Sequence, residues 1–291
     1  MQDVDCIAID WLTDRAVAAA SSGSPDPYGL RLLLRRYATE GRDDLADTIG
    51  LGLAAALEGT ATHDEARAED WLTLFVEAAS LSDDDRLPRA AGELVRILRQ
   101  RWGRESNVES LTRSVDACLA ASQLVGREEI VSTAVDELER IIAAAYRPGA
   151  GVAHDIADAE GTRGRLADQV RAASALLTAY ERTRRMPYAM LAEELMQSAR
   201  RTLWDEECGG FIASELRRGR PFVINCEAAC VLCRLAALHE AEDYQQTAVI
   251  AAGADYRRDA HRTLAALGSS YRDQGAAGAI FGLAINECFM R

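Results

Sequence analysis

The sequence predicts an all-α fold in which helix pairs repeat and close into a ring, and three observations lead to this. Apolar residues recur at helical spacing along almost all of the 291-residue chain, without the alternating β-branched runs of strands. The breaks between helices alternate between short polar turns and longer loops. The first and last helical segments are both strongly apolar, unlike the polar caps of an open repeat array. We therefore expect the two ends to pack together.

The periodicity predicts twelve helices. They are expected at 5–20, 27–39, 43–58, 69–81, 86–102, 108–124, 127–145, 166–183, 187–204, 224–239, 242–267 with a break near Gly253, and 275–290. Tight breaks such as 39–43 and 125–127 suit antiparallel helix hairpins. The longer loops, at 59–69, 147–165 and 205–223, lead into the next pair. A similar helix–turn–helix pattern recurs along the chain, as in repeat proteins, and the first helices begin near 28, 70, 109, 167, 225 and 275.

Composition narrows the function classes. The net charge of −13 disfavours nucleic-acid binding, because an acidic surface repels phosphates. The sequence has no uncharged apolar run of 18 residues and no basic leader at its start, so we expect a cytoplasmic protein without a membrane segment. An odd number of cysteines, seven, argues against a secreted disulfide framework. Every basic residue is Arg, so lysine-dependent chemistry such as Schiff-base formation is excluded, and we expect no cofactor.

The segment 163–211 resembles a known family. It carries Leu166, Asp168 and Val170, then "ALLTAYERT" at 175–183, then "LWDEECGGF" at 203–211, and "NCEAACVLCRLA" follows at 225–236. These motifs resemble the six-hairpin (α/α)6 toroids, most of all the toroid region of proteins similar to spermatogenesis-associated protein 20. N-acylglucosamine and cellobiose 2-epimerases and unsaturated glucuronyl hydrolases share that architecture. The resemblance implies a single (α/α)6 toroid domain over 1–291, with the N-terminal helix closing the ring against the C-terminal helix.

The resemblance also implies a ligand and a partner. We expect a carbohydrate or similar polar small molecule in the central funnel, bound or processed by a sugar epimerase or a glycoside-cleaving enzyme. In that family a thioredoxin-like domain precedes the toroid, so a thioredoxin-like protein is a possible partner. A second hypothesis is a non-catalytic toroid that acts as a binding or assembly module. The oligomeric state is left open.

Residues that open the inner helices of such a ring are expected to line the funnel, where free helix N-termini favour polar ligands. The catalytic candidates are His154, Asp168 and Glu227, because a histidine beside carboxylates can act as acid and base near neutral pH. Asp168 could instead cap its helix, and His154 could be an ordinary loop residue. The candidate ligand-binding residues are Tyr28, Asp70, Trp71, Arg163, Arg165, Gln169 and Asn225.

Three cysteines raise a third hypothesis. Cys226, Cys230 and Cys233 fall on one stripe of a helix, within roughly 60° of one another at 100° per residue. They could form a thiolate site for a soft metal such as Zn or Hg. A structural metal site usually draws four ligands from two pairs, which this helix alone does not supply. We favour the other interpretation, in which three small side chains pack an inner helix and no metal binds.

Overall fold

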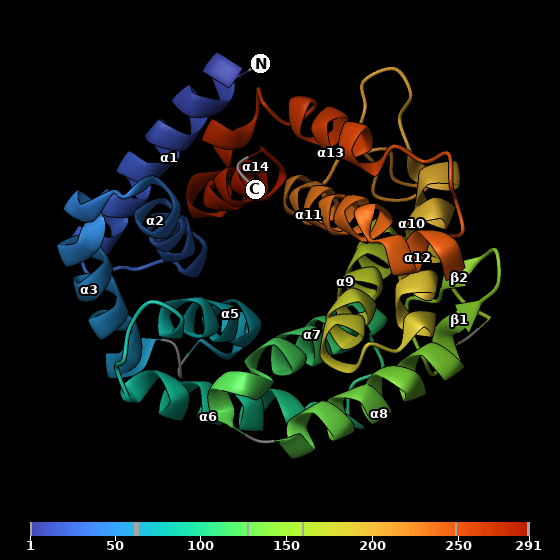
Figure 1. Cartoon of the computed structure of the whole chain (residues 1–291), viewed down its shortest axis with the longest axis horizontal. Helices are drawn as coiled ribbons and strands as arrows, with labels where there is room; N and C mark the ends of the chain where they lie inside the picture. Colours follow the sequence, from blue (N-terminus) through green and yellow to red (C-terminus); the bar gives the residue numbers. More distant parts are fainter. Residues whose placement is uncertain (1, 61–63, 127, 159, 248, 290–291) are drawn as a thin grey trace.

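The computed structural model describes residues 2–60, 64–126, 128–158, 160–247 and 249–289, and they form a ring of helices (Figure 1). The predicted all-α (α/α)6 toroid is confirmed. Within the described residues, one layer of helices faces the centre of the ring and a second layer surrounds it. The inner helices are α2 (Pro27–Glu40), α5 (Ala68–Ala79), α7 (Val108–Val125), α9 (Leu166–Thr183), α11 (Phe222–Glu240) and α14 (Ala279–Phe289).

The outer layer alternates with the inner one along the chain. Its helices are α1 (Gln2–Ser21), α3 (Ala46–Ala55), α6 (Arg86–Arg99), α8 (Glu128–Ala145), α10 (Met186–Leu203) and α13 (Tyr256–Ala265). Because consecutive helices are antiparallel, all inner helices run in one direction and begin at the same face of the ring. Short elements fill the connections: η1 (Asp43–Leu45), η2 (Ala56–Thr60), η3 (Glu65–Arg67), β1 (Tyr146–Arg147), β2 (Gly151–Val152), α12 (Glu242–Thr247) and η4 (Tyr271–Gly278).

The two ends of the chain meet, as the sequence predicts. Helix α14 packs beside α2, and α1 contacts both of them, so the N-terminal helix covers the junction between the last and the first inner helix. The approach of α14 to α2 is close at Gly282, where an added Cβ would lie 3.1 Å from the side chain of Leu32. On the outer side, Trp11 of α1 packs edge-on against Tyr271, which stacks on Phe281 of α14.

The two faces of the ring carry different connections. Where the inner helices end, the turns are tight: α2 ends on Gly41 with φ of 65°, and α9 ends on Arg184 with φ of 57°. Where the inner helices begin, two long loops, 147–165 and 205–221, lead into α9 and α11. We call the first face the short-turn face and the second the long-loop face.

Helix α11 is the one helix among the described residues that is long and apolar enough to cross a membrane by length and composition alone. Its place in the ring accounts for that composition, because α11 packs against α9, α13 and α14 and most of it is buried.

Candidate functional site

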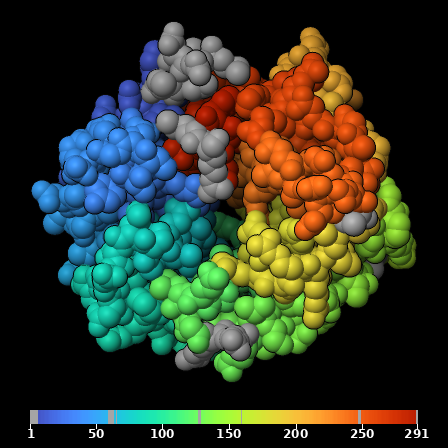
Figure 2. Space-filling model, viewed as in Figure 1, coloured from blue at the N-terminus to red at the C-terminus, as the bar shows by residue number. Residues whose placement is uncertain are grey.

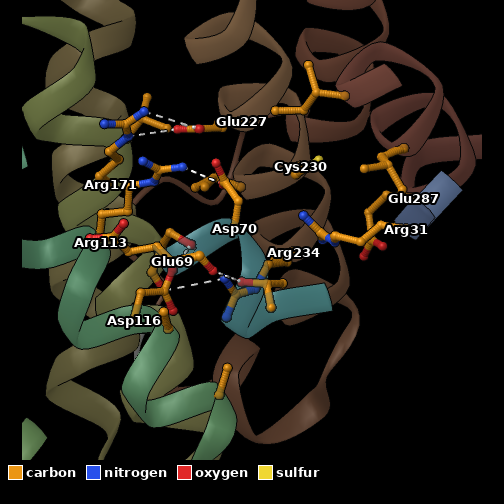
Figure 3. Close-up of a pocket in the computed structure, with 18 of the residues that line it drawn as sticks. Arg31, Glu69, Asp70, Arg113, Asp116, Arg171, Glu227, Cys230, Arg234 and Glu287 are labelled. Atoms are coloured by element: carbon orange, nitrogen blue, oxygen red, sulfur yellow. Dashed lines mark hydrogen bonds and ion pairs between the residues drawn. The ribbon is translucent and has the colours of Figure 1, made fainter. Parts of the chain in front are cut away.

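The inner helices surround a cavity of about 400 Å³. The space-filling view shows the middle of the ring hollowed, and the close-up shows polar side chains directed into this space (Figures 2 and 3). Among the described residues, all those that line the cavity lie on inner helices. They are Tyr28, Arg31, Arg35, Glu69, Asp70, Thr73, Arg113, Asp116, Ala117, Ala120, Val170, Arg171, Ser174, Glu181, Glu227, Cys230, Val231, Arg234, Ile280, Leu283 and Glu287.

Helical periodicity explains how so few elements build this lining. Residues three or four positions apart share one face of a helix, so each inner helix presents a stripe of two to three turns. On α2 the stripe is Tyr28, Arg31 and Arg35, and on α7 it includes Arg113 and Asp116. The cavity therefore has one level near the helix starts and a second level nearer the helix ends.

Ion pairs connect the inner helices at the level of their first turns. Arg113 of α7 pairs with Asp70 of α5, and it lies 3.4 Å from the hydroxyl of Tyr28 on α2. Arg171 of α9 donates from Nε to Glu227 of α11 at 3.0 Å and also pairs with Glu109 of α7. We call this set, Tyr28, Asp70, Glu109, Arg113, Arg171 and Glu227, the first-turn belt. Burial and the charge of Asp70 raise the pKa of Tyr28 well above its usual range, so its hydroxyl keeps its proton.

A second group joins α14, α2 and α5. Arg31 and Arg35 both donate to Glu77, at 2.9 and 3.0 Å, and Arg35 also donates to Glu287 at 2.9 Å. Burial opposes the ionisation of Glu77, but the two arginines outweigh it and lower the pKa of that carboxyl. The buried Nε of Arg31 has no hydrogen-bond partner.

A third group joins α7, α9 and α11 at the level nearer the helix ends. The hydroxyl of Ser174 donates to Asp116 at 2.6 Å, and Arg234 donates to Ser174 Oγ at 3.1 Å and to Glu181 at 3.0 Å. Burial raises the pKa of Asp116 above the usual range of an aspartate, although Arg234 opposes the shift. Asp116 is therefore a cavity carboxyl that holds its proton more readily than an exposed aspartate does.

Of the residues proposed from sequence, Tyr28, Asp70 and Glu227 line this cavity. His154 and Asp168 form a pair beside it, with Nδ1 of His154 3.0 Å from the carboxylate of Asp168. Arg165 donates to the other ring nitrogen, Nε2, at 2.9 Å, which places the ring hydrogen on Nδ1. Asp168 is fully buried, and burial raises its pKa to about 6 while His154 opposes the shift. Neither residue is part of the described lining.

Four further residues proposed from sequence bind protein groups outside the cavity. Gln169 exchanges two hydrogen bonds with the backbone of Val152, at 2.9 and 3.0 Å. Asn225 does the same with Phe211, at 2.8 and 3.0 Å. These amides fasten the two long loops to the starts of α9 and α11. Arg163 bonds the carbonyls of Ala145 and Gly151. Trp71 is 1 % exposed and packs in the core, with Nε1 3.3 Å from Asp64.

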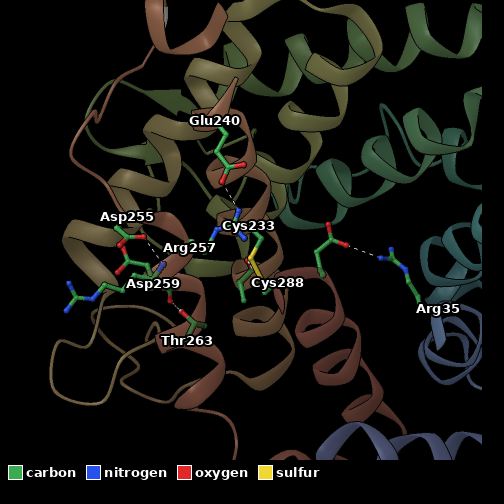
Figure 4. The surroundings of a disulfide bond; sticks show 11 residues. Arg35, Cys233, Glu240, Asp255, Arg257, Asp259, Thr263 and Cys288 are labelled. Carbon is green, nitrogen blue, oxygen red and sulfur yellow. Dashed lines mark hydrogen bonds and ion pairs between the residues drawn. A yellow bond between two sulfur atoms is a disulfide. The ribbon is translucent and has the colours of Figure 1, made fainter. Parts of the chain in front are cut away.

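The three cysteines on one face of α11 have different bonding states and environments in the structure. Cys233 forms a disulfide with Cys288, which joins α11 to α14 (Figure 4). Cys226 is buried and free, and Cys230 lines the cavity, where burial raises the pKa of its thiol to about 12. A three-thiol site from Cys226, Cys230 and Cys233 is therefore not present in this structure, because the disulfide uses one of the sulfurs. Within the described residues, no group of three metal-ligating side chains is found.

Comparison with known proteins supports the fold. No protein-family model matches the sequence, and no curated protein matches it. Among solved structures, the chain is similar to an unsaturated glucuronyl hydrolase specific for heparin, with a TM-score of 0.74 and 11 % identity, over 99 % of this chain and 97 % of that one. The unsaturated glucuronyl hydrolase of Bacillus sp. GL1 has a TM-score of 0.66 and 14 % identity, over 90 % and 85 % of the two chains.

A third similar structure is an alpha-1,6-mannanase of Salegentibacter sp. HEL1_6, an inactive variant in complex with alpha-1,6-mannotriose. Its TM-score is 0.55 at 16 % identity, over 69 % of this chain. The present chain covers only 59 % of the mannanase. At these identities the likeness is one of architecture: this chain has the (α/α)6 toroid fold of carbohydrate-processing enzymes.

Proposed function

We propose that this protein binds and processes a carbohydrate, or a similarly polar small molecule, in its central cavity. The observation that supports this most directly is the lining itself. A cavity of about 400 Å³, enclosed by inner helices, presents carboxylates, guanidinium groups and hydroxyls rather than aliphatic side chains at most positions. Similar structures include glycoside-cleaving enzymes, one of them holding alpha-1,6-mannotriose.

The proposed chemistry uses carboxyl groups in contrasting environments. Asp116 has a raised pKa and would act as the proton donor, while Glu227, paired with Arg171, would act as base or charge stabiliser. Two such carboxyls suit glycoside cleavage or sugar epimerisation. His154 and Asp168, predicted from sequence as catalytic, stay part of the proposal as a neighbouring acid–base pair at the start of α9.

The test is a binding and turnover screen with matched variants. Binding is measured by isothermal titration calorimetry, and turnover by mass spectrometry, with unsaturated glucuronyl disaccharides, alpha-1,6-manno-oligosaccharides and N-acylglucosamine. For a substrate that turns over, Asp116→Asn and Glu227→Gln should each lower kcat by about 10²- to 10⁴-fold. Glu129→Gln, an exposed residue of α8, is the control. Full activity of both cavity variants would overturn the assignment.

The alternative, a non-catalytic binding module, has an observation in its favour. The cavity arginines Arg31, Arg35, Arg113, Arg171 and Arg234 are each paired with a carboxylate of the protein itself. To bind these arginines, a ligand would have to replace the protein's own carboxylates. Sugar binding without a change in the mass or anomeric NMR spectrum of the sugar would support this reading.

We also propose three points that follow from the sequence. They are kinship with proteins similar to spermatogenesis-associated protein 20, a thioredoxin-like partner and a cytoplasmic location. The Cys233–Cys288 disulfide is relevant to the partner and to the location. Persistent disulfides are typical of oxidising compartments, and thioredoxin-like proteins exchange disulfides with their partners. Trapping of mixed disulfides in cells would test both proposals.

A further inference from the structure

We propose that ligands enter the cavity through the short-turn face, where Arg234 and Glu181 form the first polar pair they meet. This inference rests on the proposed function for the identity of the ligand, but the route itself can be measured without any ligand. It reverses the expectation from sequence, which placed the mouth of the funnel where the inner helices begin.

The cavity lining reaches the short-turn face. Arg35, Glu181, Arg234 and Glu287 lie toward the C-terminal ends of their helices, and all line the cavity. The side chain of Glu181 is 55 % exposed, whereas the carboxylates of the first-turn belt are 10 %, 22 % and 32 % exposed at Asp70, Glu227 and Glu109. Figure 1 has α12 and the turn between α9 and α10 toward the viewer, and the space-filling view from the same side shows the centre of the ring hollowed (Figure 2). Solvent therefore meets the cavity lining at this face.

Most connections at the short-turn face are short, and the longer one, from α11 to α13, is bonded to Glu193 of the outer helix α10. The turn from α9 to α10 spans only Arg184 and Arg185, and α11 is followed after Ala241 by α12. The long-loop face has the opposite character. There the backbone N–H of Val108 donates to the carbonyl of His154 at 2.9 Å, and the N–H of Leu166 donates to the carbonyl of Ala213 at 3.0 Å. Both long loops are therefore bonded to the helix starts.

Charged pairs also cross the ring just inside the long-loop face. The first-turn belt links α2, α5, α7, α9 and α11 through Arg113 and Arg171. Outside it, Arg67 lies over the ring of Tyr28 at 5.4 Å and pairs with Asp26 at 2.6 Å. A ligand that passed this way would have to break these interactions, and buried ion pairs are costly to separate.

At the proposed mouth the polar groups can exchange partners more easily. Arg234 bonds one exposed carboxylate, Glu181, and the neutral hydroxyls of Ser174 and Thr178. An exposed ion pair contributes little stability, so hydroxyl groups of a ligand could replace Glu181 on the guanidinium. Arg234 would then pass the ligand to Ser174 and Asp116, which makes Arg234 and Glu181 specificity-determining residues.

Alkylation of Cys230 tests the route. This thiol lines the cavity, whereas Cys118 and Cys226 are buried and Cys233 is in the disulfide. The exposed Cys208 is removed by Cys208→Ser in every sample. Iodoacetamide labelling is followed at fixed pH by peptide mass spectrometry. Glu181→Trp should slow labelling of Cys230 roughly tenfold by obstructing the mouth, because thiol reactivity follows access.

Glu105→Trp is the matched control, since Glu105 is a partly exposed glutamate just before α7 and outside the first-turn belt. It should change the rate by less than about twofold. Arg234→Ala is a second variant that does not depend on how a tryptophan packs, and it should speed labelling. Equal rates in the Glu181 and Glu105 variants, or slowing by Glu105→Trp alone, would overturn the proposed route. Absence of sugar binding would overturn the proposed function and leave these rates unchanged.

Discussion

Glu193 of α10 is a single buried carboxylate that organises the segment after α11. It accepts hydrogen bonds from Tyr244 at 2.6 Å, from Tyr256 at 2.9 Å, and from the backbone of Ile250 and Ala251 at 3.0 Å each. Burial opposes its ionisation, but these donors outweigh burial and lower the pKa of Glu193. The carboxylate therefore holds the connection between α12 and α13 against the outer layer.

Glu193→Gln should lower the free energy of unfolding by about 3 kcal/mol, since an amide cannot accept all of these bonds. The measurement is urea unfolding at neutral pH. Because the folded-state pKa is depressed, the stabilisation by Glu193 is present above about pH 4.3 and is lost as the pH falls further. The variant should lack this pH-dependent component. Glu129→Gln, on the exposed side of α8, should stay within about 0.5 kcal/mol of the parent protein.

Asp168 should titrate in the opposite direction. Its pKa of about 6 lies above the aspartate reference of about 3.9. Between these values the folded protein keeps a proton that the unfolded chain has lost, so its contribution to the free energy of unfolding decreases as pH rises through this window. Carbon-13 NMR of the carboxyl measures the midpoint. His154→Ala should raise it further, because His154 opposes the effect of burial. A midpoint at or below about 4 would contradict the expectation.

At the residue scale, the sequence located the site residues near the starts of the inner helices better than those further along them. Tyr28, Asp70 and Glu227 could be placed on the cavity because they open inner helices. Asp116 and Ser174 lie further along α7 and α9, and the packing of these neighbouring helices brings them together. Their spacing after Arg113 and Arg171, three residues in each case, was the signal available. The loop-anchoring roles of Gln169 and Asn225 depend on backbone groups, which a sequence pattern does not reveal.

At the scale of elements, the helices were predictable because apolar periodicity and polar turns agree along the chain. The differences have local causes. The last inner helix begins at Ala279 rather than 275, because Gly275 adopts φ of 58° inside a 3₁₀ segment. The expected helix at 242–267 is two helices, α12 and α13, as the break near Gly253 indicated. The β1–β2 hairpin within the long loop was not predicted, since strands of two residues have no periodicity.

The junction of α14 and α2 depends on a small residue. At Gly282 an added Cβ would lie 3.1 Å from Leu32 and 3.3 Å from Leu12, so Gly282→Leu should overpack the closure and cost about 1–3 kcal/mol. Thermal unfolding followed by circular dichroism measures the loss. Gly50→Leu in α3 is the matched control, because nothing lies within 4 Å of an added Cβ there. A leucine tolerated equally well at both positions would argue against tight closure.

For the whole molecule, closure means that each inner helix supports two neighbours, including the first and the last. We predict that residues 1–291 unfold as one domain, in a single calorimetric transition whose calorimetric and van't Hoff enthalpies agree. Cooperativity follows because the loss of any inner helix exposes the apolar faces of those beside it. Two separate transitions would show that the halves of the ring fold independently.

The bond between Cys233 and Cys288 also changes what a break in the backbone can do. The two cysteines are 55 residues apart, and α12 and α13 lie between them. A protease that cleaves once within this stretch leaves two pieces still tied to each other. Such a nicked protein should migrate as an intact chain on a non-reducing gel and as two fragments after reduction. The last inner helix would thus stay attached to the molecule even when the peptide chain leading to it has been cut.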